Sequence, residues 1–311
     1  MEYIVFILAM SALIYGANHV IIESERIALH FNISSFVIGA TLIALGTSLP
    51  EMAASVTASG MGETEMAVAN VIGSVTFNIA LVLGIIFLFF QNIMPTRDLF
   101  KNDSAWSLFP LLVFFIVAYD GSIDFFDGIL LLILMGGYLL FLSKDAHAIE
   151  QEIDTELTKE RFQWVKTIVL LIFGFSLIIA GAHYTIESAS AIAINIGVSE
   201  WVISLILIAF GTSLPELAVS IIAAKKNNAD MVIGNIIGSN VANLTIVLGS
   251  AAMVNPLYID FEKYGFDLLC AATASLMLVF ITANKLYNRS AGIALLILIT
   301  LMVHHSLKGL M

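Results

Sequence analysis

The chain is a succession of apolar stretches, most of them near 20 residues long, that are separated by short polar segments. A helix of about 20 apolar residues is long enough to cross the hydrocarbon core of a bilayer. The pattern therefore predicts transmembrane helices rather than the helices of a soluble domain. Ten are expected, near residues 2–22, 33–60, 66–90, 104–119, 128–143, 167–186, 201–224, 231–254, 268–284 and 290–307.

Composition narrows the class of protein further. The chain is 59% hydrophobic and 12% charged, whereas a soluble domain is about a quarter charged. Its net charge of −11 argues against nucleic acid as a partner, and the lone Cys270 excludes a disulfide framework or a cysteine-based metal site. We therefore expect an all-α integral membrane protein surrounded by lipid, because only helices or closed barrels satisfy their backbone polar groups there.

Lysine and arginine predict the orientation, since they collect on the cytoplasmic side. With the N-terminus outside, 11 of the 13 Lys and Arg residues lie on internal connections, and only Lys263 and Lys308 remain external. This predicts a multi-pass protein of the cell membrane (inner or plasma) with both termini external. The expected divisions are helices 1–5 in 1–143, a short acidic cytoplasmic segment in 144–165, interpreted as a solvated linker, and helices 6–10 in 166–311.

An internal repeat is the strongest signal in the chain. The hexapeptide Gly-Thr-Ser-Leu-Pro-Glu occurs at 46–51 and again at 211–216, an offset of 165 residues. Because each half holds five helices, an odd number, the second half must enter the membrane from the opposite face. This predicts two inverted five-helix repeats with a substrate site near the midplane between broken helices. The same offset relates Gly16 to Gly181, Asn70 to Asn235, Ser74 to Ser239, Asn78 to Asn243 and Gly84 to Gly249.

The repeated motif places polar groups on one helix face. Residues spaced i, i+3, i+4 and i+7 share a face, and Pro50 and Pro215 are expected to break the helix and free backbone carbonyls. One face carries Ala44, Thr47, Ser48 and Glu51, and its repeat carries Ala209, Thr212, Ser213 and Glu216. The following helix carries Asn70, Ser74 and Asn78, repeated as Asn235, Ser239 and Asn243.

All of these donors are oxygen atoms, which favours hard cations such as Na⁺ or Ca²⁺. Glu51 and Glu216 are the only Asp, Glu, Lys or Arg residues well inside a predicted span. Each would cost roughly 2.5–3.5 kcal/mol at the bilayer centre if it faced lipid. Two carboxylates balance one Ca²⁺ or two Na⁺. Alternative interpretations are a purely structural kink, asparagines that only bond helices together, and a protonated structural pair of glutamates.

These motifs resemble the two alpha-repeats of the sodium/calcium exchanger family within the cation/calcium antiporter superfamily, and the short central segment resembles the prokaryotic members. The resemblance implies a non-enzymatic antiporter that exchanges Na⁺ for Ca²⁺ by alternating access, with helices 1 and 6 sliding, and without a permanent cofactor. It implies that Glu51, Glu216, Thr47 and Thr212 surround Ca²⁺. It also assigns Ala44, Ala209, Ser48, Ser213, Ser74 and Ser239 to flanking Na⁺ sites, and Asn78 and Asn243 to a middle site. A monomer is compatible with these expectations.

The chain departs from the family pattern at a few positions. Ala69 stands where a glycine is usual, and Val75 stands where the second half has Asn240. Asn243 in place of an aspartate argues against K⁺ cotransport. A Ca²⁺/H⁺ or K⁺-dependent Na⁺/Ca²⁺ exchanger remains the alternative, and the rivals from other classes are a cation channel and a Ca²⁺ sensor acting through the acidic segment.

Overall fold

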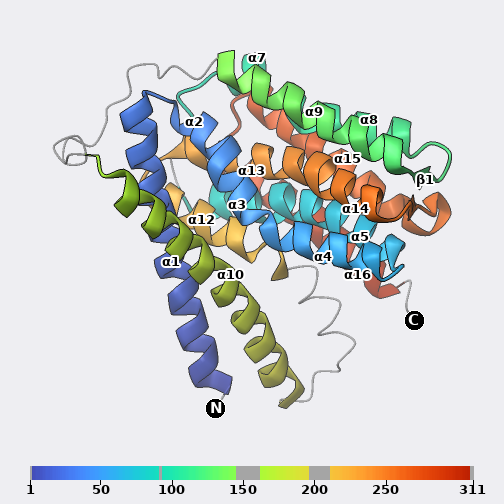
Figure 1. Ribbon diagram of the computed structural model, residues 1–311, viewed down its shortest axis with the longest axis horizontal. Helices are drawn as coiled ribbons and strands as arrows, with labels where there is room; N and C mark the ends of the chain where they lie inside the picture. The colour runs from blue at the N-terminus through green and yellow to red at the C-terminus, as the bar shows by residue number, and fades with distance from the viewer. Residues whose placement is uncertain (1, 91–92, 145–161, 196–210, 309–311) are drawn as a thin grey trace.

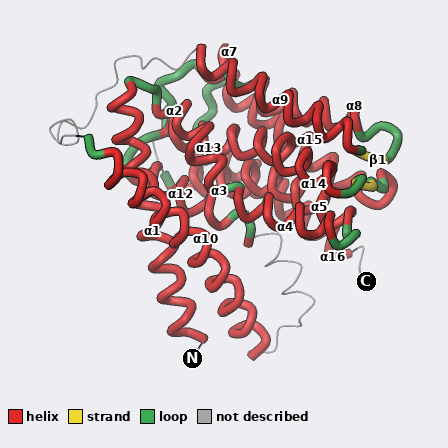
Figure 2. Tube along the Cα trace, in the orientation of Figure 1, coloured by secondary structure: helices red, strands yellow, loops and turns green. Residues whose placement is uncertain are grey.

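The computed structural model describes residues 2–90, 93–144, 162–195 and 211–308. These residues are almost entirely helical (Figure 2). Eight described helices are long and apolar enough to cross a membrane, or nine when one bent pair is counted as a single span. The predicted span at 201–224 lies partly outside the described residues, so the number ten stays a prediction.

The first half contains five groups of helices in chain order (Figure 1). Its second predicted span consists of several short pieces rather than one continuous helix. The elements are α1 (Glu2–Phe31), α2 (Ser35–Ile38), the π-helix η1 (Gly39–Ile43), α3 (Ala44–Thr47), α4 (Leu49–Gly60), α5 (Thr64–Thr76), the π-helix η2 (Phe77–Leu83), α6 (Gly84–Phe89), α7 (Leu99–Asn102), α8 (Ala105–Val117), β1 (Ser122–Ile123) and α9 (Phe125–Lys144).

The described part of the second half begins with another long helix and then repeats the central pieces. Its strand β2 pairs with β1 in an antiparallel register that places Ser122 opposite Tyr258. The elements are α10 (Trp164–Asn195), α12 (Leu214–Lys225), α13 (Ala229–Ala242), the π-helix η4 (Asn243–Val247), α14 (Leu248–Val254), β2 (Leu257–Tyr258), α15 (Phe261–Ala283) and α16 (Arg289–Lys308).

Helices α1 and α10 lie side by side and extend together beyond the other helices (Figure 1). They are antiparallel and in close contact: a Cβ on Gly16 would lie 2.7 Å from the Gly174 oxygen, and one on Gly181 would lie 2.9 Å from the Ala9 oxygen. The repeat offset converts Gly16 into Gly181 and Ala9 into Gly174. The two contacts are therefore reciprocal, which is the pattern expected of a two-fold relation.

Both of these helices are longer than the sequence predicts. Helix α1 continues to Phe31 and α10 covers Trp164–Asn195, whereas hydropathy indicates only 2–22 and 167–186. The difference arises because hydropathy detects the apolar part of a span. The backbone hydrogen bonds of the helix continue past that part into a polar stretch, which in α1 contains the buried residues Glu23 and Ser24.

The predicted break lies at the serine two residues before each proline. Between α3 and α4 the chain bends by 44°. Ser48 has φ −84° and ψ 4°, and Ser213 has φ −87° and ψ 2°, so the two halves share the same local backbone. Pro50 and Pro215 each fall in the first turn of the following helix, where a missing N–H is tolerated.

The π-helices were not predicted. They are η1 before the break in the first half, and η2 and η4, which contain Asn78 and Asn243 respectively. A π segment interrupts the regular i to i−4 hydrogen bonds of an α-helix, and such segments are frequent at functional sites.

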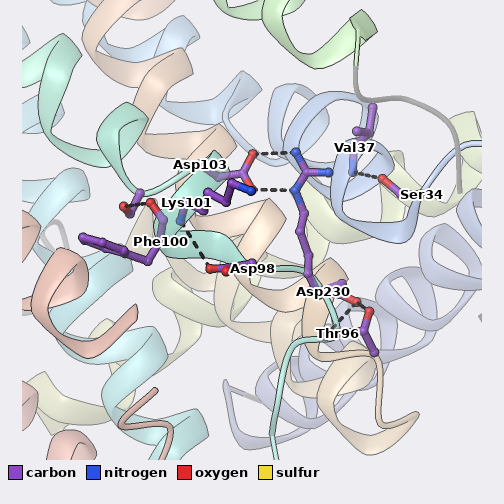
Figure 3. A network of polar contacts seen from close by, with 10 residues as sticks. Ser34, Val37, Thr96, Asp98, Phe100, Lys101, Asp103 and Asp230 are labelled. Carbon is purple, nitrogen blue, oxygen red and sulfur yellow. Dashed lines mark hydrogen bonds and ion pairs between the residues drawn. The ribbon is translucent and has the colours of Figure 1, made fainter. Parts of the chain in front are cut away.

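The start of α13 is fixed by a polar network near one end of the helices (Figure 3). The Asp230 carboxylate accepts hydrogen bonds from the Thr96 backbone N–H at 3.3 Å, the Thr96 hydroxyl, and the Arg97 backbone N–H at 3.2 Å. Arg97 in turn forms a two-pronged ion pair with Asp103. The guanidinium also lies over the Phe36 ring, 4.9 Å from its centroid, and so links α13, α7 and α2.

Candidate cation site

The candidate residues that the structure describes lie on four helical segments at the centre of the molecule. These are the α3–α4 break, α5 with η2, the start of α12, and α13 with η4 (Figure 1). Helix α13 is buried along its entire length, from Ala229 to Ala242. By contrast, α1, α9 and α10 expose large apolar side chains on one side, as helices at the periphery of a membrane bundle do.

Most of the predicted ligands are buried in this centre. Of the twelve candidates, ten are buried and Thr212 is half-buried. Ala209 falls outside the described residues. The ten buried ones are Ala44, Thr47, Ser48, Glu51, Ser74, Asn78, Ser213, Glu216, Ser239 and Asn243.

Glu51 and Glu216 differ from the other buried acids of the described chain because they have neither an ion pair nor a backbone N–H partner and share one long hydrogen bond from Ser48. Three further acids are buried near the ends of spans, and each has one or more partners. Glu23 pairs with Arg26 at 2.7 Å, Asp103 with Arg97 at 3.0 Å, and Asp230 receives backbone N–H groups. An unpaired buried charge is costly, so the two glutamates are the exception that needs an explanation.

Both glutamate side chains are fully buried, at 0% exposure. Neither carboxylate oxygen of Glu51 has a hydrogen-bond partner among the described residues. Glu216 Oε1 accepts one long bond from Ser48 Oγ at 3.5 Å, and its Oε2 has none. The two glutamates come from opposite halves but lie in one region, since Ser48, one turn before Glu51, contacts Glu216. A cation or a proton must neutralise this pair.

Hydroxyl groups meet across the two halves in matched pairs. Thr47 Oγ1 lies 3.4 Å from Ser239 Oγ, and Ser74 Oγ lies 3.4 Å from Thr212 Oγ1. The repeat offset converts the first pair into the second. The Thr47 hydroxyl also donates a hydrogen bond to the Ala44 carbonyl oxygen at 3.3 Å. This carbonyl, a predicted cation ligand, therefore lies beside the Thr47 hydroxyl.

Asn70 and Asn235 hold the glutamate-bearing helices against the next ones. Asn70 Nδ2 donates to Ser55 Oγ at 2.9 Å, and Asn235 Nδ2 donates to Ser220 Oγ at 3.3 Å. Asn235 Oδ1 also accepts from the Thr47 hydroxyl at 3.5 Å. The repeat predicts Asn235 on the polar face, although the predicted ligands do not include it. Its position one turn before Ser239 was the signal that could have included it.

A second group that sequence reasoning missed involves Asn240. Asn78 Nδ2 donates to Asn240 Oδ1 at 3.1 Å. Asn243 is fully buried and neither of its amide atoms has a partner within the described chain. The signal for Asn240 was its departure from the repeat, since the first half has Val75 at that position.

The donor set suits a hard cation. Among the described residues no group of three or more His, Cys, Asp or Glu side chains could hold a metal ion. The buried donors are instead two carboxylates together with hydroxyl, amide and carbonyl oxygens. Such oxygens are the ligands of Na⁺ and Ca²⁺, whereas zinc and copper sites use nitrogen and sulfur.

Comparison with known proteins gives consistent matches over nearly the whole chain. The model of the family described as sodium/calcium exchanger protein matches residues 1–144 and 166–307. An uncharacterized membrane protein of Methanocaldococcus jannaschii is 38% identical over 293 residues, covering 94% of each chain. The sodium/calcium exchanger MaX1 of Methanosarcina acetivorans is 27% identical and covers 95% of each. The solved structure of the sodium-calcium exchanger NCX_Mj, soaked with Na⁺ and Sr²⁺, superposes with a TM-score of 0.82 at 35% identity, covering 98% of this chain and 99% of that one.

Proposed function

The chain belongs to the sodium/calcium exchanger protein family, and on this premise we propose that it is a secondary antiporter that exchanges Na⁺ for Ca²⁺ across the cell membrane. The observation that carries the proposal is the buried pair Glu51 and Glu216, whose carboxylates together accept one long hydrogen bond and have no cationic partner among the described side chains. One Ca²⁺ or two Na⁺ would neutralise the pair, so the two ions compete for the same carboxylates. Exchange follows from that competition.

The twelve predicted ligands together form the proposed cage around Glu51 and Glu216. Some of them bind Ca²⁺ and others bind Na⁺. Thr47 and Thr212 complete the Ca²⁺ site with the glutamates, and their hydroxyl contacts to Ser239 and Ser74 hold them in place. Flanking Na⁺ sites use the Ala44 and Ala209 carbonyls with Ser48, Ser213, Ser74 and Ser239, and a middle site uses Asn78 and Asn243. The ions are substrates, and the transporter needs no permanent cofactor.

For alternating access, the proposed transporter has ten helices arranged as two inverted halves, 1–143 and 166–311. The acidic linker at 144–165 joins the halves, and most of it lies outside the described residues. The reciprocal contacts of Gly16 and Gly181 support this arrangement. In the proposed cycle, α1 and α10 slide as one unit past the central helices and open the cage first to one face and then to the other. Both termini lie on the external side.

The decisive experiment is Na⁺-dependent ⁴⁵Ca²⁺ uptake into Na⁺-loaded proteoliposomes. Uptake is expected only with an outward Na⁺ gradient. Uptake that requires K⁺ would instead indicate a K⁺-dependent exchanger, uptake driven by a pH gradient would indicate Ca²⁺/H⁺ exchange, and uptake without any counter-ion gradient would indicate a channel.

Neutralising either glutamate tests the assignment of the site. Glu51→Gln and Glu216→Gln preserve side-chain volume and are each expected to abolish uptake, because one remaining carboxylate no longer balances Ca²⁺. Glu65→Gln is the matched control: Glu65 lies on α5 but is about half exposed and pairs with Lys263 at 2.7 Å, so uptake should persist. Full uptake by both cage variants would refute the proposal.

A further inference from the structure

Three buried amides occupy one part of the cage and are incompletely bonded. Asn78, Asn240 and Asn243 are each exposed by 1% or less. Among the described residues their side chains make one hydrogen bond, from Asn78 Nδ2 to Asn240 Oδ1 at 3.1 Å. Asn78 Oδ1, Asn240 Nδ2 and both amide atoms of Asn243 have no partner in the described chain. Buried amides are normally bonded, so these atoms indicate a place prepared for a ligand.

The single bond breaks the symmetry of the repeat. Asn78 and Asn243 are equivalent under the offset of 165 residues, but Asn240 corresponds to Val75. Asn78 therefore has an amide partner from the opposite half, whereas valine at the equivalent position offers Asn243 none. The two equivalent asparagines are thus held differently.

The orientation of an amide decides whether it can bind a cation, because only its carbonyl oxygen is an acceptor. The bond to Asn240 engages the NH₂ group of Asn78 and leaves Oδ1 available. With Asn240 in this orientation, turning the Asn78 amide over would place two oxygen atoms against each other and lose the bond. We infer that Asn240 is a positioning residue, which holds Asn78 with its oxygen presented to a hard cation while Asn243 stays unconstrained. This inference rests on the proposed function of the cage.

A double-mutant cycle tests whether Asn240 acts through Asn78. The variants are Asn240→Val, which reproduces the residue of the first half, Asn78→Ala, and both together. The full-length protein is purified in detergent, and its affinities for Ca²⁺ and for Na⁺ are measured from the cation-dependent rise in melting temperature. Asn240→Val is expected to weaken the affinity for at least one of the two cations about three- to tenfold, the equivalent of one hydrogen bond.

The cycle distinguishes positioning from a merely structural role. In the Asn78→Ala background, Asn240→Val should cause no further loss of affinity, because the group that it positions is already absent. Asn240→Asp keeps an oxygen acceptor in the same place and should retain cation binding. The control is Thr245→Val, an isosteric change at a buried residue of η4 whose hydroxyl donates to the Val241 carbonyl one turn earlier, in α13; cation affinity should stay within about twofold of wild type.

Two results would overturn the inference. One is equal loss of affinity from Asn240→Val in the presence and absence of Asn78, and the other is no change in affinity at all. If Asn240→Val does not fold, Asn240→Ser, which is too short to reach Asn78, takes its place in the cycle. Failure of the proposed function would be seen separately, as absence of Na⁺-driven ⁴⁵Ca²⁺ uptake by wild type, because the melting-temperature assay measures binding alone.

Discussion

Gly181→Ala is the sharpest structural prediction, because it acts on the close contact between α1 and α10. A Cβ at Gly181 would lie 2.7 Å from the Leu13 backbone nitrogen and 2.9 Å from the Ala9 oxygen. Both are backbone atoms, so no side chain can rotate away. Ordinary contact begins at 3.4 Å, which means that the helices must separate by about 0.7 Å.

The expected cost follows from this displacement. Forcing an extra methyl group into a packed interface costs about 1–3 kcal/mol, and the better helix propensity of alanine returns roughly 0.5–1 kcal/mol. The net effect is a loss of up to about 2.5 kcal/mol and about 1 kcal/mol at the middle of the two ranges, or a few degrees in melting temperature. Gly16→Ala should have the same sign, since its Cβ would lie 2.7 Å from the Gly174 oxygen.

The chain supplies a matched control in Gly137→Ala. Gly137 is an exposed residue within α9, and a Cβ there would meet nothing within 4 Å. The same substitution should therefore leave stability unchanged or raise it by about 0.5–1 kcal/mol. Melting temperatures are measured on purified protein by fluorescence, together with the Ca²⁺ affinity, which neither variant should change because neither residue belongs to the cage.

A close α1–α10 contact should lower the stability of Gly181→Ala but not that of Gly137→Ala. Gly181→Ala with wild-type stability, or Gly137→Ala with an equal loss, would show that the α1–α10 contact is looser than the structure indicates. In that case the two helices would also be poor candidates for a unit that moves together.

Three further outcomes are expected in melting experiments. Glu216→Gln should raise the melting temperature of cation-free protein, since it removes one of two buried carboxylates that have no cationic partner among the described side chains, and should also abolish the stabilisation by Ca²⁺; a fall in the cation-free value would contradict this. Asp230→Ala should cost about 1–3 kcal/mol, because it leaves two backbone N–H groups without their acceptor, and wild-type stability would show that water replaces the carboxylate. Glu25→Gln should cost less than about 1 kcal/mol, because the ion pair with Lys226 is partly exposed; a larger loss would mean that this pair fixes α1 to α12.

Much of this architecture could be predicted from the order of residues alone. The apolar stretches identify most of the spans, because the hydrocarbon layer imposes a minimum apolar length on each helix. The hexapeptide at 46–51 and 211–216 identifies the glutamates and the break at each proline, because a proline lacks the N–H that a continuous helix needs. These are local properties, and each is written in a short stretch of chain.

Only the tertiary structure decided which side chains meet. Thr47 and Ser239 come from different halves, as do Asn78 and Asn240, and their contacts depend on how far one helix is shifted along another. A stripe of polar residues indicates the face of a helix but not that shift. The π-helices and the extra turns of α1 and α10 have the same origin, since neighbouring helices, rather than local hydropathy, determine where the regular hydrogen bonding changes. The sequence by itself determined the spans, the repeat and the oxygen chemistry of the site, whereas packing between the halves decided how those oxygens are paired.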